Sequence, residues 1–227
     1  IVEKLGIYKS RELGMIFSDR KQAGELLYKR LAEELSGVLP GEMIVLSIPK
    51  GGCPVGSVVA NRFGCDNDVL ISKKIVSQAE SELALGAVSL SVSSAVVNQR
   101  LVDSMGITSK MFKQMVKDVQ AQVDADVCVY RAGRLSLNLE EKVVILVDDG
   151  VATGETMIAA VREVFLYHPH KVVVAVPVIA KDSLARLEQE ADAVVFLQAP
   201  ADFFAVGQWY RDFTQVSRED VLELINC

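Results

Sequence analysis

The sequence predicts an α/β protein in which helices cover both faces of a parallel β-sheet. Two observations support this prediction. Short runs rich in β-branched residues recur along the chain and are continuously apolar, which is typical of strands that are buried on both faces. Each run is followed by a turn and then by a segment with an apolar stripe at helical spacing. Strands and helices should therefore alternate around one core, with right-handed crossovers.

The individual elements can be assigned in chain order. Asp19, with Gln22 three residues later, predicts a capping-box-like start for a first helix, which leucines on one face would bury. The helix after the first strand should have Pro54 at its first position and Gly64 just past its end. A long helix should follow Thr108, and a shorter one should follow each of the third and fourth strands. The five predicted strands are residues 43–48, 68–71, 142–147, 172–178 and 193–197.

We expect a single domain over residues 1–227, because no repeat, low-complexity tract or flexible linker divides the chain. The core should span about residues 38–198. Aromatic residues gather after the last strand. A small terminal subdomain, which we call the hood, should therefore form from about residues 17–36 and 199–227.

Composition and charge argue against two kinds of partner. The chain has 24 Lys and Arg against 30 Asp and Glu, a formal net charge of −6, whereas non-specific nucleic-acid binding needs a net basic surface. The longest strongly apolar stretch, residues 172–180, is shorter than the about 20 residues that span a bilayer. We therefore expect no nucleic-acid partner and no membrane span. The four cysteines have neither CxxC nor zinc-like spacing, and we expect them to be reduced, in a cytoplasmic protein.

The most specific motif follows the strand at residues 142–147. Asp148 and Asp149 are followed by a loop of small residues that should open a helix, and ligands of open parallel sheets bind at the carboxyl ends of strands. Backbone N–H groups and hydroxyls at a helix N-terminus suit a phosphate. Adjacent carboxylates can accept hydrogen bonds from vicinal hydroxyls, and a ribose 5-phosphate presents both features. The alternative is a structural Asp-Asp turn that caps the helix.

Lysines mark two other predicted strand ends. Lys50 precedes two glycines after the first strand, and glycines let backbone N–H groups approach an oxyanion, although Lys-Gly-Gly is also an ordinary turn. Lys73 and Lys74 should leave the second strand and lead into a polar loop that contains Glu82. A solvated surface loop is the alternative there.

Residues 143–156 resemble the phosphoribosyl-diphosphate (PRPP) binding motif of type I phosphoribosyltransferases, and the Lys-Gly-Gly turn is similar to the pyrophosphate loop of that family, in which a peptide bond is often cis. The resemblance covers most of the chain. It is closest to small relatives of unassigned base, which share the Phe-x-Asp-Arg opening at 17–20, Gly-Ala-Val at 86–88 and Trp-Tyr at 209–210. It implies a phosphoribosyltransferase-like core with a hood, and Mg²⁺-dependent transfer of the phosphoribosyl group from PRPP to a nitrogenous base or related acceptor. Pyrophosphate would be released, and the protein would be a homodimer.

The resemblance also implies roles for particular residues. The ribose hydroxyls and the 5-phosphate would be bound by Asp148, Asp149, Gly150, Val151, Ala152, Thr153, Gly154, Glu155 and Thr156. The pyrophosphate loop would be Pro49, Lys50, Gly51 and Gly52. Catalytic side chains would be Lys50, Lys73, Lys74 and Glu82. The base would stack on hood residues Phe203, Phe204, Trp209 and Tyr210, which could instead form the small core of the hood.

Several residues depart from the pattern of the relatives. Lys50 and Lys73 stand at positions where the relatives usually carry Arg. A lysine lacks the planar guanidinium that can bind a phosphate through two hydrogen bonds. Glu155 places an acid in the phosphate loop, where it would weaken binding unless its side chain points to solvent. Ala152 replaces an acid that relatives acting on 6-oxopurines usually have, which argues against a hypoxanthine or guanine enzyme.

The sequence leaves one alternative function open and argues against several other classes of protein. The alternative function is a non-catalytic regulatory protein that binds PRPP or a nucleotide. P-loop and dinucleotide-binding motifs are absent from the sequence. A receiver domain would need about a hundred residues after its Asp-Asp strand, more than follow this one.

Overall fold

A five-stranded parallel sheet forms the centre of the molecule, in the order β2-β1-β6-β7-β8. The computed structural model describes residues 14–77, 84–90, 95–134 and 138–225. The five predicted strands are all present, and β2 differs most, because it begins at Asp66 and ends at Val69. The strands are β1 (Met43–Ser47), β2 (Asp66–Val69), β6 (Val143–Val147), β7 (Lys171–Val178) and β8 (Ala193–Gln198).

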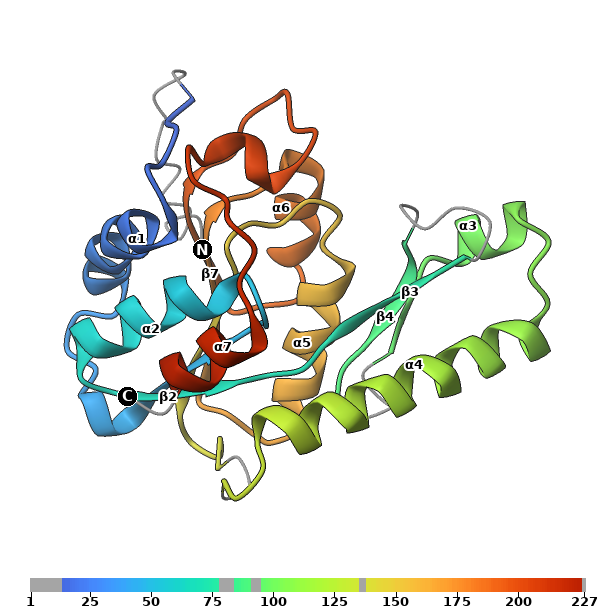
Figure 1. Cartoon of the computed structure of the whole chain (residues 1–227), viewed down its shortest axis with the longest axis horizontal. Helices are drawn as coiled ribbons and strands as arrows, with labels where there is room; N and C mark the ends of the chain where they lie inside the picture. Colours follow the sequence, from blue (N-terminus) through green and yellow to red (C-terminus); the bar gives the residue numbers. More distant parts are fainter. Residues whose placement is uncertain (1–13, 78–83, 91–94, 135–137, 226–227) are drawn as a thin grey trace, which may run out of the picture.

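Helices cover both faces of this sheet (Figure 1). α1 (Arg20–Glu34) and α2 (Gly52–Phe63) lie on one face, and α5 (Glu155–Phe165) and α6 (Lys181–Leu187) lie on the other. Successive side chains of a strand point to opposite faces. Val45 and Ile145 therefore pack with leucines of α1, whereas Leu46 and Leu146 pack with α5.

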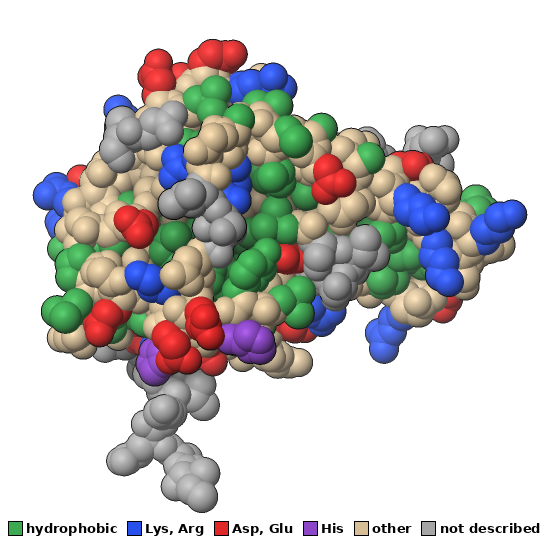
Figure 2. Space-filling model, turned by 90° about the horizontal axis from the view of Figure 1, so that it is seen from below, with side chains coloured by type: hydrophobic (Ala, Val, Ile, Leu, Met, Phe, Trp, Pro, Cys, Tyr) green, Lys and Arg blue, Asp and Glu red, His purple; other side chains and the backbone are tan. Residues whose placement is uncertain are grey.

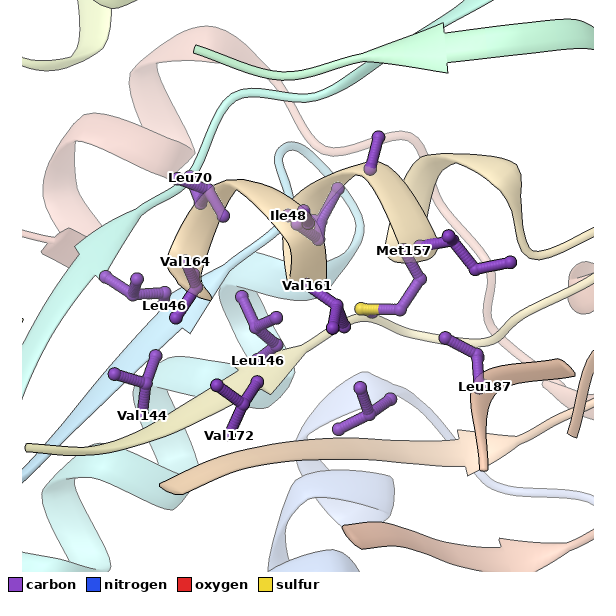
Figure 3. Packing of buried hydrophobic residues seen from close by; sticks show 14 of the residues in the cluster. Leu46, Ile48, Leu70, Val144, Leu146, Met157, Val161, Val164, Val172 and Leu187 are labelled. Carbon is purple, nitrogen blue, oxygen red and sulfur yellow. The ribbon is translucent and has the colours of Figure 1, made fainter. Parts of the chain in front are cut away.

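The packing of α5 on the sheet fixes the helix that follows the Asp-Asp motif. Figure 3 shows apolar side chains of α5 among those of neighbouring strands. Each fully buried side chain of this kind contributes about 1.5–3 kcal/mol, so the apolar layer holds α5, and with it the loop at its start. The labelled residues of α5 are Met157, Val161 and Val164, and those of the strands are Leu46, Val144, Leu146 and Val172.

Two predicted helix starts and one predicted helix end are confirmed, and one predicted start is wrong. Asp19 caps α1 by accepting a hydrogen bond from the backbone N–H of Gln22 at 2.7 Å. Gly64 ends α2 in the left-handed conformation, with φ of 68°, which glycine adopts without strain. Thr108 caps the long helix α4 (Ser109–Tyr130). Pro54 is the third residue of α2, not the first, because the helix begins at Gly52.

An arm projects from the core beside α5 (Figure 1). It contains the three-stranded antiparallel sheet β3 (Lys73–Val76), β4 (Ala84–Val88) and β5 (Val96–Val97), together with α3 (Gln99–Ser104) and α4. Ile75, Leu85, Val102 and Val116 form a small core of its own. Sequence analysis predicted α4 but not the arm.

The hood differs from the prediction in its first part. Leu27 and Leu31 of α1 pack against the central sheet, so this helix belongs to a core layer. The segment that precedes α1 does join the chain that follows β8, because Phe17 N–H donates to the Trp209 carbonyl at 2.8 Å. After β8 come the 3₁₀ helix η3 (Val206–Trp209) and α7 (Arg218–Ile225), which contacts α2 and β2.

Figure 2 shows the underside of the molecule. Lys and Arg side chains project from the arm in this view. Lys110, Lys113 and Lys117 of α4 are exposed. His168 and His170 are exposed near acidic side chains of the core. Within the described ranges, no helix is both long enough and apolar enough to cross a bilayer.

The described cysteines are Cys53, Cys65 and Cys128, and they form no disulfide. Cys53 is buried in α2, and Cys128 is exposed on α4.

Candidate functional site

The loops at residues 48–52 and 148–154 leave the same edge of the sheet. β1 and β6 are parallel neighbours, with Ser47 paired to Val147. Ile48 N–H donates to the Val147 carbonyl at 2.8 Å, which holds the first residue of one loop against the other strand. The Pro49–Lys50 peptide bond is cis. Functional groups from the two loops can therefore meet on one ligand.

The second loop opens α5 in the way that an anion site requires. Gly154 precedes the helix with φ of +85°, in the left-handed region that favours glycine. The first hydrogen bond along the helix runs from Ile158 N–H to the Gly154 carbonyl at 2.9 Å. The N–H groups of residues 155–157 therefore have no partner within the helix, and the helix dipole favours a negative charge beside them.

A cavity of about 360 Å³ lies against this loop. Apolar side chains also line it, among them Ile48, Met157 and hood residue Val206. A carboxylate, two lysines and a helix N-terminus therefore converge on one space. Of the predicted site residues, those that line it are Pro49, Lys73, Lys74, Asp148, Gly150, Val151, Ala152, Thr153, Gly154 and Thr156.

The two adjacent carboxylates have different surroundings. Asp148 is half-buried and lines this cavity. Asp149 is only 8% exposed and lines a second hollow of about 420 Å³, together with Arg20, Lys50 and Gly51. The predicted pyrophosphate loop therefore contributes to both spaces: Pro49 lines the cavity, and Lys50 lines the second hollow.

Burial dominates the electrostatics of both acids. It raises the pKa of Asp148 well above its ordinary value, and the neighbouring charge of Asp149 raises it further. Burial also raises the pKa of Asp149, but the hydrogen bond and charge of Arg20 oppose that rise. Strongly perturbed acids in a cavity are typical of functional sites.

The structure corrects the predicted environment of Lys73 and Lys74. These lysines do not leave a strand of the parallel sheet, because β2 ends at Val69 and they open β3 of the arm. Lys73 Nζ lies 2.8 Å from Asp126 Oδ2 of α4, so its charge is partly balanced, whereas Lys74 is exposed. Glu82 and the rest of the predicted loop at 79–82 lie outside the described residues.

The sequence interpretation required the Glu155 side chain to point to solvent if a phosphate binds beside it. The structure shows that this side chain is buried. It is 4% exposed, and Oε1 accepts a hydrogen bond from Arg186 Nη1 at 2.9 Å. The same guanidinium donates to the Thr153 carbonyl at 2.9 Å, and Ser183 Oγ donates to the Ala152 carbonyl. Residues of α6 therefore balance the acid and hold two carbonyls of the loop. Sequence reasoning missed both, since no motif links α6 to this loop.

The aromatic residues of the hood do not line the cavity. Tyr210 is buried and its hydroxyl donates to the Asp149 carbonyl at 2.6 Å. Trp209 packs near Phe203, with ring centroids 6.3 Å apart, and Phe204 is 89% exposed. Trp209 and Tyr210 agree with the small-core alternative, because both belong to a hydrophobic cluster with Phe17, whereas Phe204 lies on the surface.

Paired acids beside a helix N-terminus at the edge of a parallel sheet can bind a ligand that carries both hydroxyl groups and a phosphate. Comparison with known families agrees: residues 19–212 match the family "Phosphoribosyl transferase domain". The chain belongs to this phosphoribosyltransferase family. The predicted fold class, a parallel-sheet core of the type I phosphoribosyltransferase kind, is therefore confirmed.

Individual relatives extend this finding over nearly the whole chain. Two Mycobacterium tuberculosis proteins, from strains CDC 1551 / Oshkosh and ATCC 25618 / H37Rv, are each named "Putative phosphoribosyl transferase" and are 37% identical over 215 residues. The match covers 93% of this chain but 46% of each relative, so the chain spans about half their length. The crystal structure of TT1426 from Thermus thermophilus is similar with a TM-score of 0.76 and 36% identity, over 93% of this chain and 98% of that one.

Proposed function

We propose that this domain binds PRPP with Mg²⁺ and transfers the phosphoribosyl group to a nitrogenous base or related acceptor, releasing pyrophosphate. The observation that carries the proposal is the cavity in which the Asp148 carboxylate, the start of α5 and two lysines of β3 meet. This set of groups complements a sugar with a phosphate at one end and hydroxyls at the other.

Each part of PRPP has a matching partner in the proposal. The 5-phosphate accepts hydrogen bonds from the start of α5 and from the hydroxyls of Thr153 and Thr156. Asp148 accepts hydrogen bonds from the ribose hydroxyls, with Asp149 beside it. In the loop at 49–52, the Lys50 side chain and the backbone N–H groups of Lys50 and Gly51 bind the pyrophosphate, with Lys73 and Lys74 adding positive charge.

In the transfer step, the bond between C1 of the ribose and the pyrophosphate oxygen breaks, and its electron pair leaves with the pyrophosphate. A bond from C1 to the acceptor nitrogen forms, and the proton of that nitrogen passes to solvent water. Positive charge develops on the sugar as negative charge grows on the leaving group. The main tasks of the protein are to hold the reactants in line and to balance the leaving charge.

Mg²⁺ would supply charge neutralisation on the leaving pyrophosphate. In the ranges that the structure describes, no group of three or more His, Cys, Asp or Glu side chains could hold a metal ion. Mg²⁺ usually keeps several waters and binds through substrate phosphates. The cavity therefore fits an ion that enters with PRPP, held mainly by PRPP oxygens.

Calorimetry with PRPP and Mg²⁺ tests the binding half of the proposal. We expect binding by the intact chain and its loss in Asp148→Asn and in Asp149→Asn, with circular dichroism showing that both variants are folded. Asp118→Asn is the matched control, because Asp118 is an exposed acid of α4 on the arm. Absence of binding by the intact chain would overturn the proposal.

Release of pyrophosphate tests the enzymatic half. The chain is incubated with PRPP, Mg²⁺ and each member of a panel of purine, pyrimidine and pyridine bases. Release with one base supports an enzyme and identifies its acceptor. Binding without release from any base would instead support a regulatory PRPP-binding protein. We also propose that the protein is a homodimer and is cytoplasmic. Light scattering of the same sample tests whether it is a homodimer.

A further inference from the structure

The side chain of Arg20 joins three parts of the molecule that are distant in sequence. It lies at the start of α1, and its Nε donates to Asp149 Oδ2 at 2.8 Å. Its Nη1 donates to the Thr214 carbonyl at 2.8 Å. The guanidinium carbon also lies 4.0 Å from the centre of the Phe213 ring, within the range of a cation–π contact. No step of the proposed function uses this arginine.

The ion pair between Arg20 and Asp149 is shielded from water. Each side chain is 11% exposed, whereas the Arg62–Glu25 pair that joins α2 to α1 has exposed fractions of 56% and 39%. Loss of one partner from a shielded pair leaves an uncompensated charge, whereas an exposed pair is solvated without its partner. Loss of Arg20 should therefore leave the Asp149 charge uncompensated, whereas loss of Arg62 should leave Glu25 solvated.

The Asp149 carboxylate in turn lies against the pyrophosphate-type loop. A Cβ atom built on Gly51 would lie 2.2 Å from Asp149 Oδ2, so only glycine leaves room for the carboxylate in this position. Lys50 and Gly51 line the same hollow as Arg20 and Asp149. Movement of Asp149 would therefore be transmitted to the loop, and Arg20 is the side chain that opposes this movement.

We propose that Arg20 is a positioning residue of the PRPP site, which holds the Asp149 carboxylate fixed against Gly51 and links it to the segment at 213–214. This inference rests on the proposed function, because it concerns the same site. Arg20 acts through Asp149 and not on the reacting atoms. Its effect should therefore appear in the protonation of Asp149 and in the pH dependence of PRPP binding.

Several charged or titratable groups surround Asp149. They are Arg20 of α1, Asp148 in the same loop, Cys53 of α2, Lys50 in the hollow and Tyr210 of the hood. Burial raises the pKa of Asp149, and Arg20 opposes the rise. Without this arginine the pKa should rise further, so that Asp149 becomes protonated at a higher pH. PRPP binding should then fail first on the acid side of its pH profile.

The test compares Arg20→Gln and Arg20→Lys with Arg62→Gln as the matched control. The first readout is the titration of the Asp149 carboxyl by carbon-13 NMR without PRPP. The second is calorimetric affinity for PRPP with Mg²⁺ between about pH 6 and pH 8.5. Arg20→Gln should move the Asp149 titration to higher pH and weaken PRPP binding about 10- to 100-fold at pH 7, the effect of losing one charge-assisted hydrogen bond. The loss should be smaller at pH 8.5. Arg20→Lys should be intermediate, because it keeps the charge but loses the fork.

The inference is overturned if Arg20→Gln moves neither the titration nor the affinity, or if Arg62→Gln produces equal changes. If Arg20→Gln does not fold, the Asp149 titration and the PRPP affinity are measured in Arg20→Lys and Phe213→Leu instead. Unchanged values in both of these variants would overturn the inference. The two proposals fail separately. An intact chain that binds no PRPP overturns the proposed function and the positioning role, while a shifted titration would still support the linkage between Arg20 and Asp149.

Discussion

The Glu155 carboxylate lies 2.9 Å from the guanidinium of Arg186 and is almost fully buried, although Glu155 is the first residue of α5. An acid at this position would repel a phosphate if its charge faced the ligand. Arg186 balances that charge, and it also binds the Thr153 carbonyl at 2.9 Å. The pair therefore has two effects: it stabilises the fold, and it fixes the phosphate-type loop.

Arg186→Gln should destabilise the protein, because the buried Glu155 loses its charged partner. We expect a loss of about 1–3 kcal/mol, below the value for a fully buried pair, since the Arg186 side chain is 45% exposed. The free energy of unfolding in urea measures this loss. PRPP affinity of the folded variant should also fall, as the Thr153 carbonyl loses its donor.

Arg162→Gln is the control for this prediction. Arg162 pairs with Glu190 and is 44% exposed, nearly as exposed as Arg186, but Glu190 is 27% exposed. Its loss should change stability by about 0.5 kcal/mol or less. Equal destabilisation by the two substitutions would contradict the role assigned to the burial of Glu155.

The central sheet was predictable because its strands are buried on both faces, which makes them continuous apolar runs. The helices that follow the first and third predicted strands were likewise predicted from their apolar stripes. The arm was missed because its strands are not continuous runs of β-branched residues: β3 begins with two lysines, β4 contains Gly86, and β5 has only two residues. Lys73 was consequently assigned to a strand end instead of an antiparallel hairpin.

The site was predictable only in its local part. Residues 148–156 are contiguous in the chain, so their sequence alone predicted an anion site. The partners of these residues come from elsewhere: Arg20 contacts Asp149 across 129 positions and Arg186 contacts Glu155 across 31. A single sequence carries no signal for pairs of this kind. The exposure of Phe204 and the burial of Tyr210 depended in the same way on tertiary packing.

Asp148→Asn should stabilise the fold while it removes PRPP binding. Burial raises the pKa of Asp148 in the folded state, so the folded chain holds this proton more tightly than the unfolded chain does. Stability is therefore lost as pH rises from the unfolded pKa towards the folded one, and the loss persists above both. The variant lacks this penalty, so its advantage in urea unfolding should be larger at pH 8 than at pH 4. An advantage that is equal at both pH values would contradict the assignment.

Tyr210→Phe should weaken the attachment of the hood to the Asp-Asp motif. The hydroxyl donates to the Asp149 carbonyl at 2.6 Å within a buried site, and its removal leaves that carbonyl without this donor. We expect a cost of about 1–2 kcal/mol in urea unfolding. Tyr28→Phe is the matched control, because the Tyr28 ring packs edge-on against Phe63 with centroids 4.9 Å apart. If the two variants lose the same stability, the hydroxyl of Tyr210 does not support the motif.

Gly51→Ala should impair PRPP binding through Asp149. The added Cβ would lie 2.2 Å from Asp149 Oδ2 and 2.6 Å from its carboxyl carbon, so the carboxylate must move away from Arg20 or the loop must shift. Overpacking of this kind costs about 1–3 kcal/mol. Gly41→Ala is the control, since nothing lies within 4 Å of a Cβ built there, and its effect should stay within about 0.5 kcal/mol. Urea unfolding and PRPP calorimetry measure both variants. Wild-type affinity in Gly51→Ala would mean that contact between this loop and Asp149 is not needed to bind PRPP.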